Sequence, residues 1–105
     1  MAEDHFEVRK EGPVLTVVLG ANLSVVNASA LTDEINLYKG QDIEKLVFDA
    51  TKLTYISSSG IRVILYCKKF LSKNLEIVFV NCNKEVLDVF DLVGIIPYIT
   101  FLTNP

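Results

Sequence analysis

The segment that most constrains the fold covers residues 46–71, which read LVFDATKLTYISSSGIRVILYCKKFL. It begins with a short continuous apolar run that ends at Asp49, and such a run is typical of a central strand in a parallel sheet. The small polar run SSSG at residues 57–60 then opens an amphipathic helical pattern. We therefore predict hydroxyl groups at a helix N-terminus, near the carboxyl end of a buried strand. The unpaired backbone N–H groups and the helix dipole there would favour a phosphate on one of these serines.

The rest of the chain alternates between strand and helix patterns. Residues 5–10 and 14–19 indicate two strands of a hairpin, because Gly12-Pro13 between them is a turn signal. The later elements are, in order, a helix capped by Asn27 and stopped at Gly40, a strand at residues 46–48, a helix at 58–72, a strand at 76–80, a helix between Asn83 and Gly94, and a short last strand at 99–102.

Helical connections between strands imply parallel pairing in the centre of a sheet. We therefore predict an α/β fold, organised as a single domain over residues 1–105. It should contain one mixed sheet of four or five strands, with the first hairpin at one side and the helices mainly on one face.

Helical spacing also predicts which side chains face the core. In the helix at 58–72 we expect an inward stripe of Ile61, Ile64, Leu65 and Leu71, and an opposite stripe of Arg62, Tyr66, Lys69 and Lys73. The first helix should bury Ala28, Leu31, Ile35 and Tyr38, and the last should bury Val86, Leu87, Phe90 and Val93. A basic stripe of this kind is more typical of a solvated helix face than of a partner surface.

Charge and hydropathy argue against several classes of protein. The net charge of −3 and the lack of a basic tract argue against nucleic acid as a partner. No apolar run reaches the roughly 20 residues that span a bilayer, so we expect no membrane insertion. The charged first residues contain no signal-peptide core, which favours a cytoplasmic location. Cys67 and Cys82 match no metal-binding pattern, and we expect two reduced thiols that pack in the interior.

Catalytic motifs are weak in this sequence. The one histidine is His5, and the serine run is not a G-x-S-x-G elbow, which disfavours a Ser-His-Asp triad. Neither a metal-ligand spacing nor a nucleotide-binding glycine motif occurs, so we predict no enzyme activity and no cofactor. Asp49 stands near the serine run and fits either a turn or a site. Ser58 or Ser59 also has the ordinary role of capping the helix, with Gly60 permitting close packing.

Two segments resemble the signature of the STAS domain family, the sulfate-transporter and anti-sigma-factor-antagonist domains. Residues 46–49 and 53–61 are similar to the family's strand and to its turn, Asp-Ser-Ser/Thr-Gly followed by an aliphatic residue. Residues 23–31, LSVVNASAL, resemble the family's stretch Leu-Asp-x-x-Thr/Asn-Ala-x-x-Leu. The order of elements also matches over residues 6–103, and the size fits the stand-alone bacterial form.

The resemblance implies a regulatory protein rather than an enzyme. In this family, the dephosphorylated antagonist binds an anti-sigma factor and thereby frees a sigma factor. The anti-sigma factor is also a serine kinase of the histidine-kinase-like ATPase fold, and a PP2C-type phosphatase reverses the phosphorylation. Carried over to this chain, the phosphoacceptor is Ser58. The implied partner-binding residues are Leu23, Ser24, Asn27, Ser57, Ser58, Ser59, Gly60 and Arg62.

Two positions depart from the family pattern, because Ser24 and Ser57 stand where the family has aspartate. The loss of two carboxylates would reduce repulsion of a phosphate, and Ser57 is itself a second candidate acceptor. The same loss also fits a non-switching scaffold or accessory subunit. Stand-alone domains of the family act in this way in stress-signalling assemblies and in phospholipid-transport ABC complexes. The sequence leaves both functions open.

Overall fold

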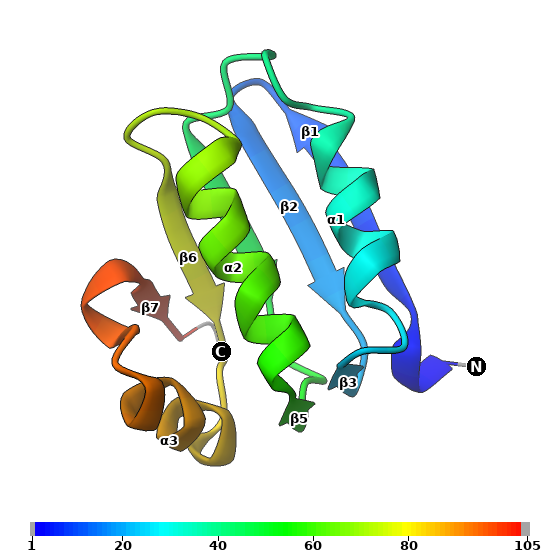
Figure 1. The fold of residues 1–105 in the computed structure, drawn as a ribbon, viewed down its shortest axis with the longest axis vertical. Helices are drawn as coiled ribbons and strands as arrows, with labels where there is room; N and C mark the ends of the chain where they lie inside the picture. Colours follow the sequence, from blue (N-terminus) through cyan, green and yellow to red (C-terminus); the bar gives the residue numbers. More distant parts are fainter. Residues whose placement is uncertain (1, 104–105) are drawn as a thin grey trace.

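A computed structural model describes residues 2–103 of the chain, and Figure 1 shows its fold. Five of its strands form one mixed sheet in the order β1-β2-β4-β6-β7. The antiparallel hairpin of β1 (Phe6–Glu11) and β2 (Val14–Leu19) lies at one side. The pairs β2–β4, β4–β6 and β6–β7 are parallel, with β4 at Lys45–Asp49, β6 at Glu76–Val80 and β7 at Thr100–Leu102. The predicted mixed sheet with an edge hairpin is therefore confirmed.

Helices α1 (Ala28–Asn36) and α2 (Ser58–Phe70) lie side by side across one face of this sheet. Helix α3 (Lys84–Val93) packs near the end of β6, in the lower part of Figure 1. The remaining described elements are two short 3-10 turns, η1 at Ala2–Asp4 and η2 at Ile96–Tyr98, and two two-residue strands, β3 at Asn22–Leu23 and β5 at Tyr55–Ile56. The prediction that the helices mainly cover one face is also confirmed. No helix within residues 2–103 combines the length and the apolar character that a membrane span requires.

The core is built on three fully buried phenylalanines. The rings of Phe48 and Phe79 stack with centroids 4.7 Å apart, and Phe90 meets Phe79 edge-on at 5.1 Å. Such aromatic pairs add to the stability that apolar burial already gives. Burial also raises the pKa of the Cys67 thiol to about 12 and that of Cys82 to about 11, so both thiols are protonated at neutral pH. The prediction that the two cysteines pack in the interior agrees with this, with Cys67 buried and Cys82 partly buried.

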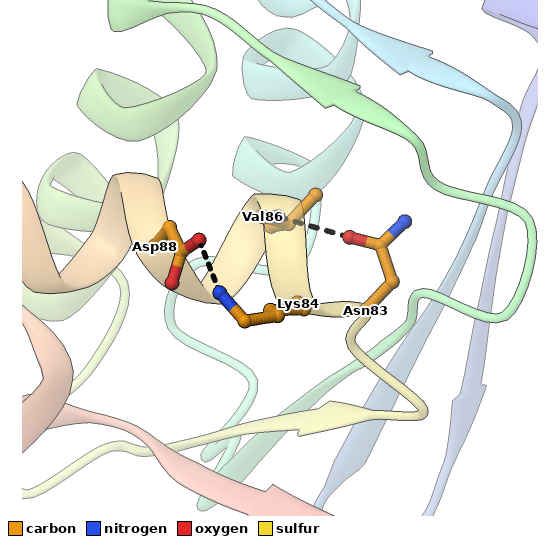
Figure 2. Close-up of polar contacts among 4 residues, drawn as sticks. All are labelled: Asn83, Lys84, Val86 and Asp88. Carbon is orange, nitrogen blue, oxygen red and sulfur yellow. Dashed lines mark hydrogen bonds and ion pairs between the residues drawn. The ribbon is translucent and has the colours of Figure 1, made fainter.

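Helix α3 begins as the sequence predicts. The Asn83 side chain accepts a hydrogen bond from the Val86 backbone N–H at 2.9 Å, and Figure 2 shows this cap. Figure 2 also shows the ion pair of Lys84 with Asp88 at 2.9 Å, which raises the pKa of the exposed Lys84. The Asn83 amide also donates to the Leu53 carbonyl at 3.0 Å. Asn83 thereby ties α3 to the loop between β4 and α2.

Several predicted helix faces are wrong in detail. Leu65 and Val93, expected inside, are 45% and 47% exposed. Tyr66, expected on the solvated stripe, is half-buried and its hydroxyl donates to the Asn36 side chain at 3.0 Å. The first helix ends at Asn36 rather than at Gly40, because the chain tightens there into turns such as that from the Tyr38 N–H to the Ile35 carbonyl.

Candidate functional site

A pair of two-residue strands brings the two motif segments together. Strand β3 (Asn22–Leu23) runs parallel to β5 (Tyr55–Ile56) beyond the end of β2, at the bottom of Figure 1. The pairing continues into the serine run, since the Ser57 backbone N–H donates to the Leu23 carbonyl at 2.9 Å. The loop after Leu23 and the turn at Ser57 therefore form one continuous surface. Sequence reasoning predicted this neighbourhood from the family resemblance but did not predict the strand pair.

The three serines have three different environments. Ser57 is the N-cap of α2, because its Oγ accepts hydrogen bonds from the backbone N–H groups of Ser59 at 3.2 Å and Gly60 at 3.4 Å. The prediction that Ser58 or Ser59 is the cap is therefore wrong. Ser58 is exposed, and its hydroxyl makes no hydrogen bond within residues 2–103. The Ser59 Oγ accepts from the Arg62 guanidinium at 3.1 Å.

Replacing Ser57 with alanine should lower the free energy of unfolding by about 1 kcal/mol, the usual value of an N-cap hydrogen bond. The change to aspartate should keep the cap, because a carboxylate also accepts backbone N–H bonds and favours the positive end of the helix dipole. Urea denaturation of both variants and of the parent measures the difference. Equal stability of the alanine variant and the parent would mean that the Ser57 hydroxyl does not cap α2 in solution.

Asn27 organises the loop before α1. Its position precedes the helix as predicted, but its side chain does not cap it. Instead the buried amide accepts from the Ser24 N–H at 2.9 Å and donates to the carbonyls of Asn22 and Asp4, both at 2.9 Å. Ser24 in turn accepts from the Val26 N–H through its hydroxyl at 3.3 Å. These bonds fix the path of residues 22–27 beside the serine run.

The predicted site residues divide by exposure. Leu23, Asn27 and Gly60 are buried and shape the surface from beneath. Ser58 and Arg62 are exposed, so a partner can contact them directly. Arg62 also lines a shallow groove of about 260 Å³ between α1 and α2, together with Ser29, Thr32, Ser59 and Tyr66.

Sequence reasoning missed three apolar side chains on the same end of the molecule. Val25 is 76% exposed, Val26 is 72% exposed and Tyr55 is 54% exposed. In the sequence, only the two adjacent valines within a polar loop could have indicated this exposed apolar surface.

Asp49 forms a turn, which was one of the two roles that the sequence left open for it. Its carboxylate accepts hydrogen bonds from the Thr51 backbone N–H at 3.1 Å and from the Thr51 hydroxyl at 2.6 Å. No group of three or more histidine, cysteine or acidic side chains in the described part of the chain could hold a metal ion.

Comparison with known proteins identifies the family. The STAS domain model matches residues 5–104, and the chain therefore belongs to the STAS domain family. No match was found among curated protein sequences.

Solved structures share the fold at low sequence identity. The anti-sigma factor antagonist SpoIIAA in its unphosphorylated form has a TM-score of 0.75 and 13% identity, over 96% of this chain and 89% of that chain. SpoIIAA of Bacillus in its phosphorylated form has a TM-score of 0.74 and 16% identity, over 92% of this chain and 90% of that chain. An anti-sigma factor antagonist from Mycobacterium paratuberculosis has a TM-score of 0.79 and 18% identity, over 93% of this chain and 84% of that chain.

Proposed function

We propose that this chain is an anti-sigma factor antagonist whose unphosphorylated form binds an anti-sigma factor. That partner would also be a serine kinase of the histidine-kinase-like ATPase fold, acting on Ser58, and a PP2C-type phosphatase would restore the binding form. One observation carries the proposal: an exposed Ser58 hydroxyl, free of hydrogen bonds within the described residues, stands in the surface that the β3–β5 pair assembles. Membership of the STAS family and the fold shared with SpoIIAA and the mycobacterial antagonist support it.

Electrostatics explains how one phosphate would act as a switch. It would add roughly −1.5 to −2 charge at pH 7 to an exposed contact residue, which opposes binding through repulsion and desolvation. The fold would survive, because the phosphate would lie at the positive end of the α2 dipole. That SpoIIAA has been solved in both forms is consistent with a fold that tolerates the group.

The serines at the two family aspartate positions fit this proposal. The hydroxyls of Ser24 and Ser57 each accept a backbone N–H, a role that a carboxylate would also fill. The local structure is thus kept while two negative charges are absent. A kinase would meet less repulsion when it brings a phosphate to Ser58.

Replacing Ser58 with aspartate should weaken binding to the anti-sigma factor by about tenfold or more, because the carboxylate places a charge in the contact surface. The Ser58→Ala variant is the matched control: it should fold like the parent, since the hydroxyl makes no hydrogen bond within the described residues, and it should lose much less affinity than the aspartate variant because it adds no charge. Titration calorimetry with the purified anti-sigma factor measures both affinities, and circular dichroism checks that both variants fold. Equal affinity of the aspartate variant and the parent would contradict the switch.

The runner-up function is a non-switching scaffold or accessory subunit, which the missing acids at positions 24 and 57 favour. Intact and peptide masses of the protein from its own host, with and without phosphatase treatment, separate the two. One phosphate on Ser58 supports the switch. Phosphate on Ser57 would move the acceptor to the capping residue, and no phosphate under any growth condition would favour the scaffold.

A further inference from the structure

The outer face of α2 carries positive charge in a chain whose net charge is −3. The helix contains Arg62, Lys68 and Lys69 and no acidic residue. The ion pairs within the described residues join Lys45 to Glu76 and Lys84 to Asp88, so none of these three basic side chains is neutralised in this way. Lys68 is held in place by donating to the Leu75 carbonyl at 2.6 Å, and the Lys69 ammonium lies over the Phe70 ring at 5.3 Å from its centroid.

An apolar slot lies beside two of these lysines, between α2 and η2, and we name it the α2–η2 slot. Its volume is about 160 Å³, and Lys68 and Lys69 line it together with Leu65 and Tyr98. The two apolar side chains are 45% and 59% exposed. The remaining lining consists of four buried isoleucines, Ile64, Ile77, Ile95 and Ile99. The slot is therefore an accessible apolar depression bordered by the side chains of two exposed lysines, Lys68 and Lys69, which are in no ion pair within the described residues.

The size and charge of the slot indicate what it fits. It is smaller than the roughly 300–1,000 Å³ of typical small-molecule sites, which suits one apolar side chain better than a whole ligand. Lys68 and Lys69 border the slot, so a complementary partner carries acidic groups beside the apolar side chain that enters it. A concave apolar depression also fits a protruding side chain better than it fits the flat surface of a bilayer. A second depression, which adjoins the slot, is lined by both Lys68 and the acidic residue Glu76. Glu76 is paired with Lys45, so it does not neutralise Lys68.

We propose that the α2–η2 slot docks an acidic segment of a partner protein, with one leucine-type side chain in the slot and its carboxylates against Lys68 and Lys69. Lys68 lies ten residues after Ser58 in the same helix, about 15 Å further along its axis. The docking site is therefore separate from the proposed phosphoacceptor. It would remain available whether or not Ser58 carries a phosphate.

The test uses the full chain labelled with nitrogen-15 and a synthetic peptide of alternating aspartates and glutamates around a central leucine. We expect the peptide to shift the amide signals of Leu65, Lys68, Ile95 and Tyr98 and to leave those of Ser58 and Gly60 in place. The double variant Lys68→Gln, Lys69→Gln should bind about tenfold more weakly, because both ammonium groups are lost. A peptide with alanine in place of the leucine should also bind about tenfold more weakly.

Control experiments distinguish docking at the slot from misfolding, from the proposed switch at Ser58 and from binding to a membrane surface. The Lys69→Gln single variant keeps the Lys68 hydrogen bond to Leu75, so its weaker binding would not result from the loss of that bond, and circular dichroism checks that it folds. Ser58→Asp should bind the peptide like the parent, whatever its effect on the anti-sigma factor. Unshifted signals at millimolar peptide, or equal affinity of the double variant and the parent, would overturn the proposal. Co-sedimentation with phosphatidylglycerol vesicles without any response to the peptide would also overturn it, in favour of a membrane surface.

Discussion

Replacing Gly60 with alanine should destabilise the protein, although the same change usually stabilises a helix. Within a helix, alanine is favoured over glycine by about 1 kcal/mol. At Gly60, however, a Cβ would lie 2.7 Å from Ile56 Cγ1, 2.8 Å from the Leu23 carbonyl oxygen and 2.9 Å from Leu23 Cγ. The oxygen belongs to the backbone, so α2 or the β3–β5 pair must shift. Since overpacking costs about 1–3 kcal/mol, we expect the free energy of unfolding to fall by about 2 kcal/mol.

The same substitution should disturb the candidate site. The Leu23 carbonyl that would meet the new methyl group also accepts the Ser57 N–H, the bond that joins the upstream loop to the serine run. Urea denaturation gives the stability, and the amide spectrum should show shifts at residues 22–28 and 55–60. Ser58→Ala, two positions earlier in the same helix, is the control and should change stability by less than about 0.5 kcal/mol. A Gly60→Ala protein more stable than the parent would show that α2 can move away at little cost.

The serine run predicted the start of α2 but not the residue that caps it. Each of three adjacent serines can accept a backbone N–H, so the residue types alone do not decide between them. The backbone decides, because Ser57 is extended at φ −98° and ψ 175° whereas Ser58 already belongs to the helix. The exposure of Ser58 follows from the same choice. A one-residue change in the helix start therefore changes which hydroxyl is free.

The β3–β5 pair lies beyond what pattern reasoning can find. Asn22 and Tyr55 are 33 residues apart, and a two-residue strand has too few positions to show an alternating pattern. The role of Asn27 could not be predicted either, because it depends on contacts outside the helix that the residue precedes. Asparagine before a helix usually caps it, but here the amide bonds to backbone groups of the preceding loop and of Asp4.

The predicted buried face of α2 is rotated about the helix axis relative to the face that the structure buries. The apolar residues of the pattern allow Leu65 inside, but α1 packs along the other side of the helix. That contact draws Tyr66 inward to Asn36, and Val63 and Cys67 are also buried, whereas Leu65 remains at the edge beside Tyr98. The neighbour of a helix thus decides which flank of its apolar stripe is covered. The pattern of apolar residues within α2 does not indicate on which side α1 packs.

Replacing Ile64 with aspartate should unfold the protein. Ile64 is 2% exposed, in the centre of the buried face of α2. The change removes an apolar side chain, at about 2–5 kcal/mol, and also places an unpaired carboxylate among apolar neighbours. Together these costs approach the whole stability of a typical domain, about 5–15 kcal/mol. We expect no cooperative thermal transition by circular dichroism at neutral pH and an amide spectrum of an unfolded chain.

Leu65→Asp is the matched control, because it places the same charge one residue later in the same helix. Leu65 is 45% exposed, so its carboxylate can remain hydrated, and the expected loss of stability is about 1 kcal/mol. The pair of variants therefore tests the orientation of α2 directly, since the inward stripe predicted from the sequence makes both positions equivalent. If both variants unfold, Leu65 is buried in solution and the α2–η2 slot is closed. If Ile64→Asp melts like the parent, α2 presents a different face to the sheet.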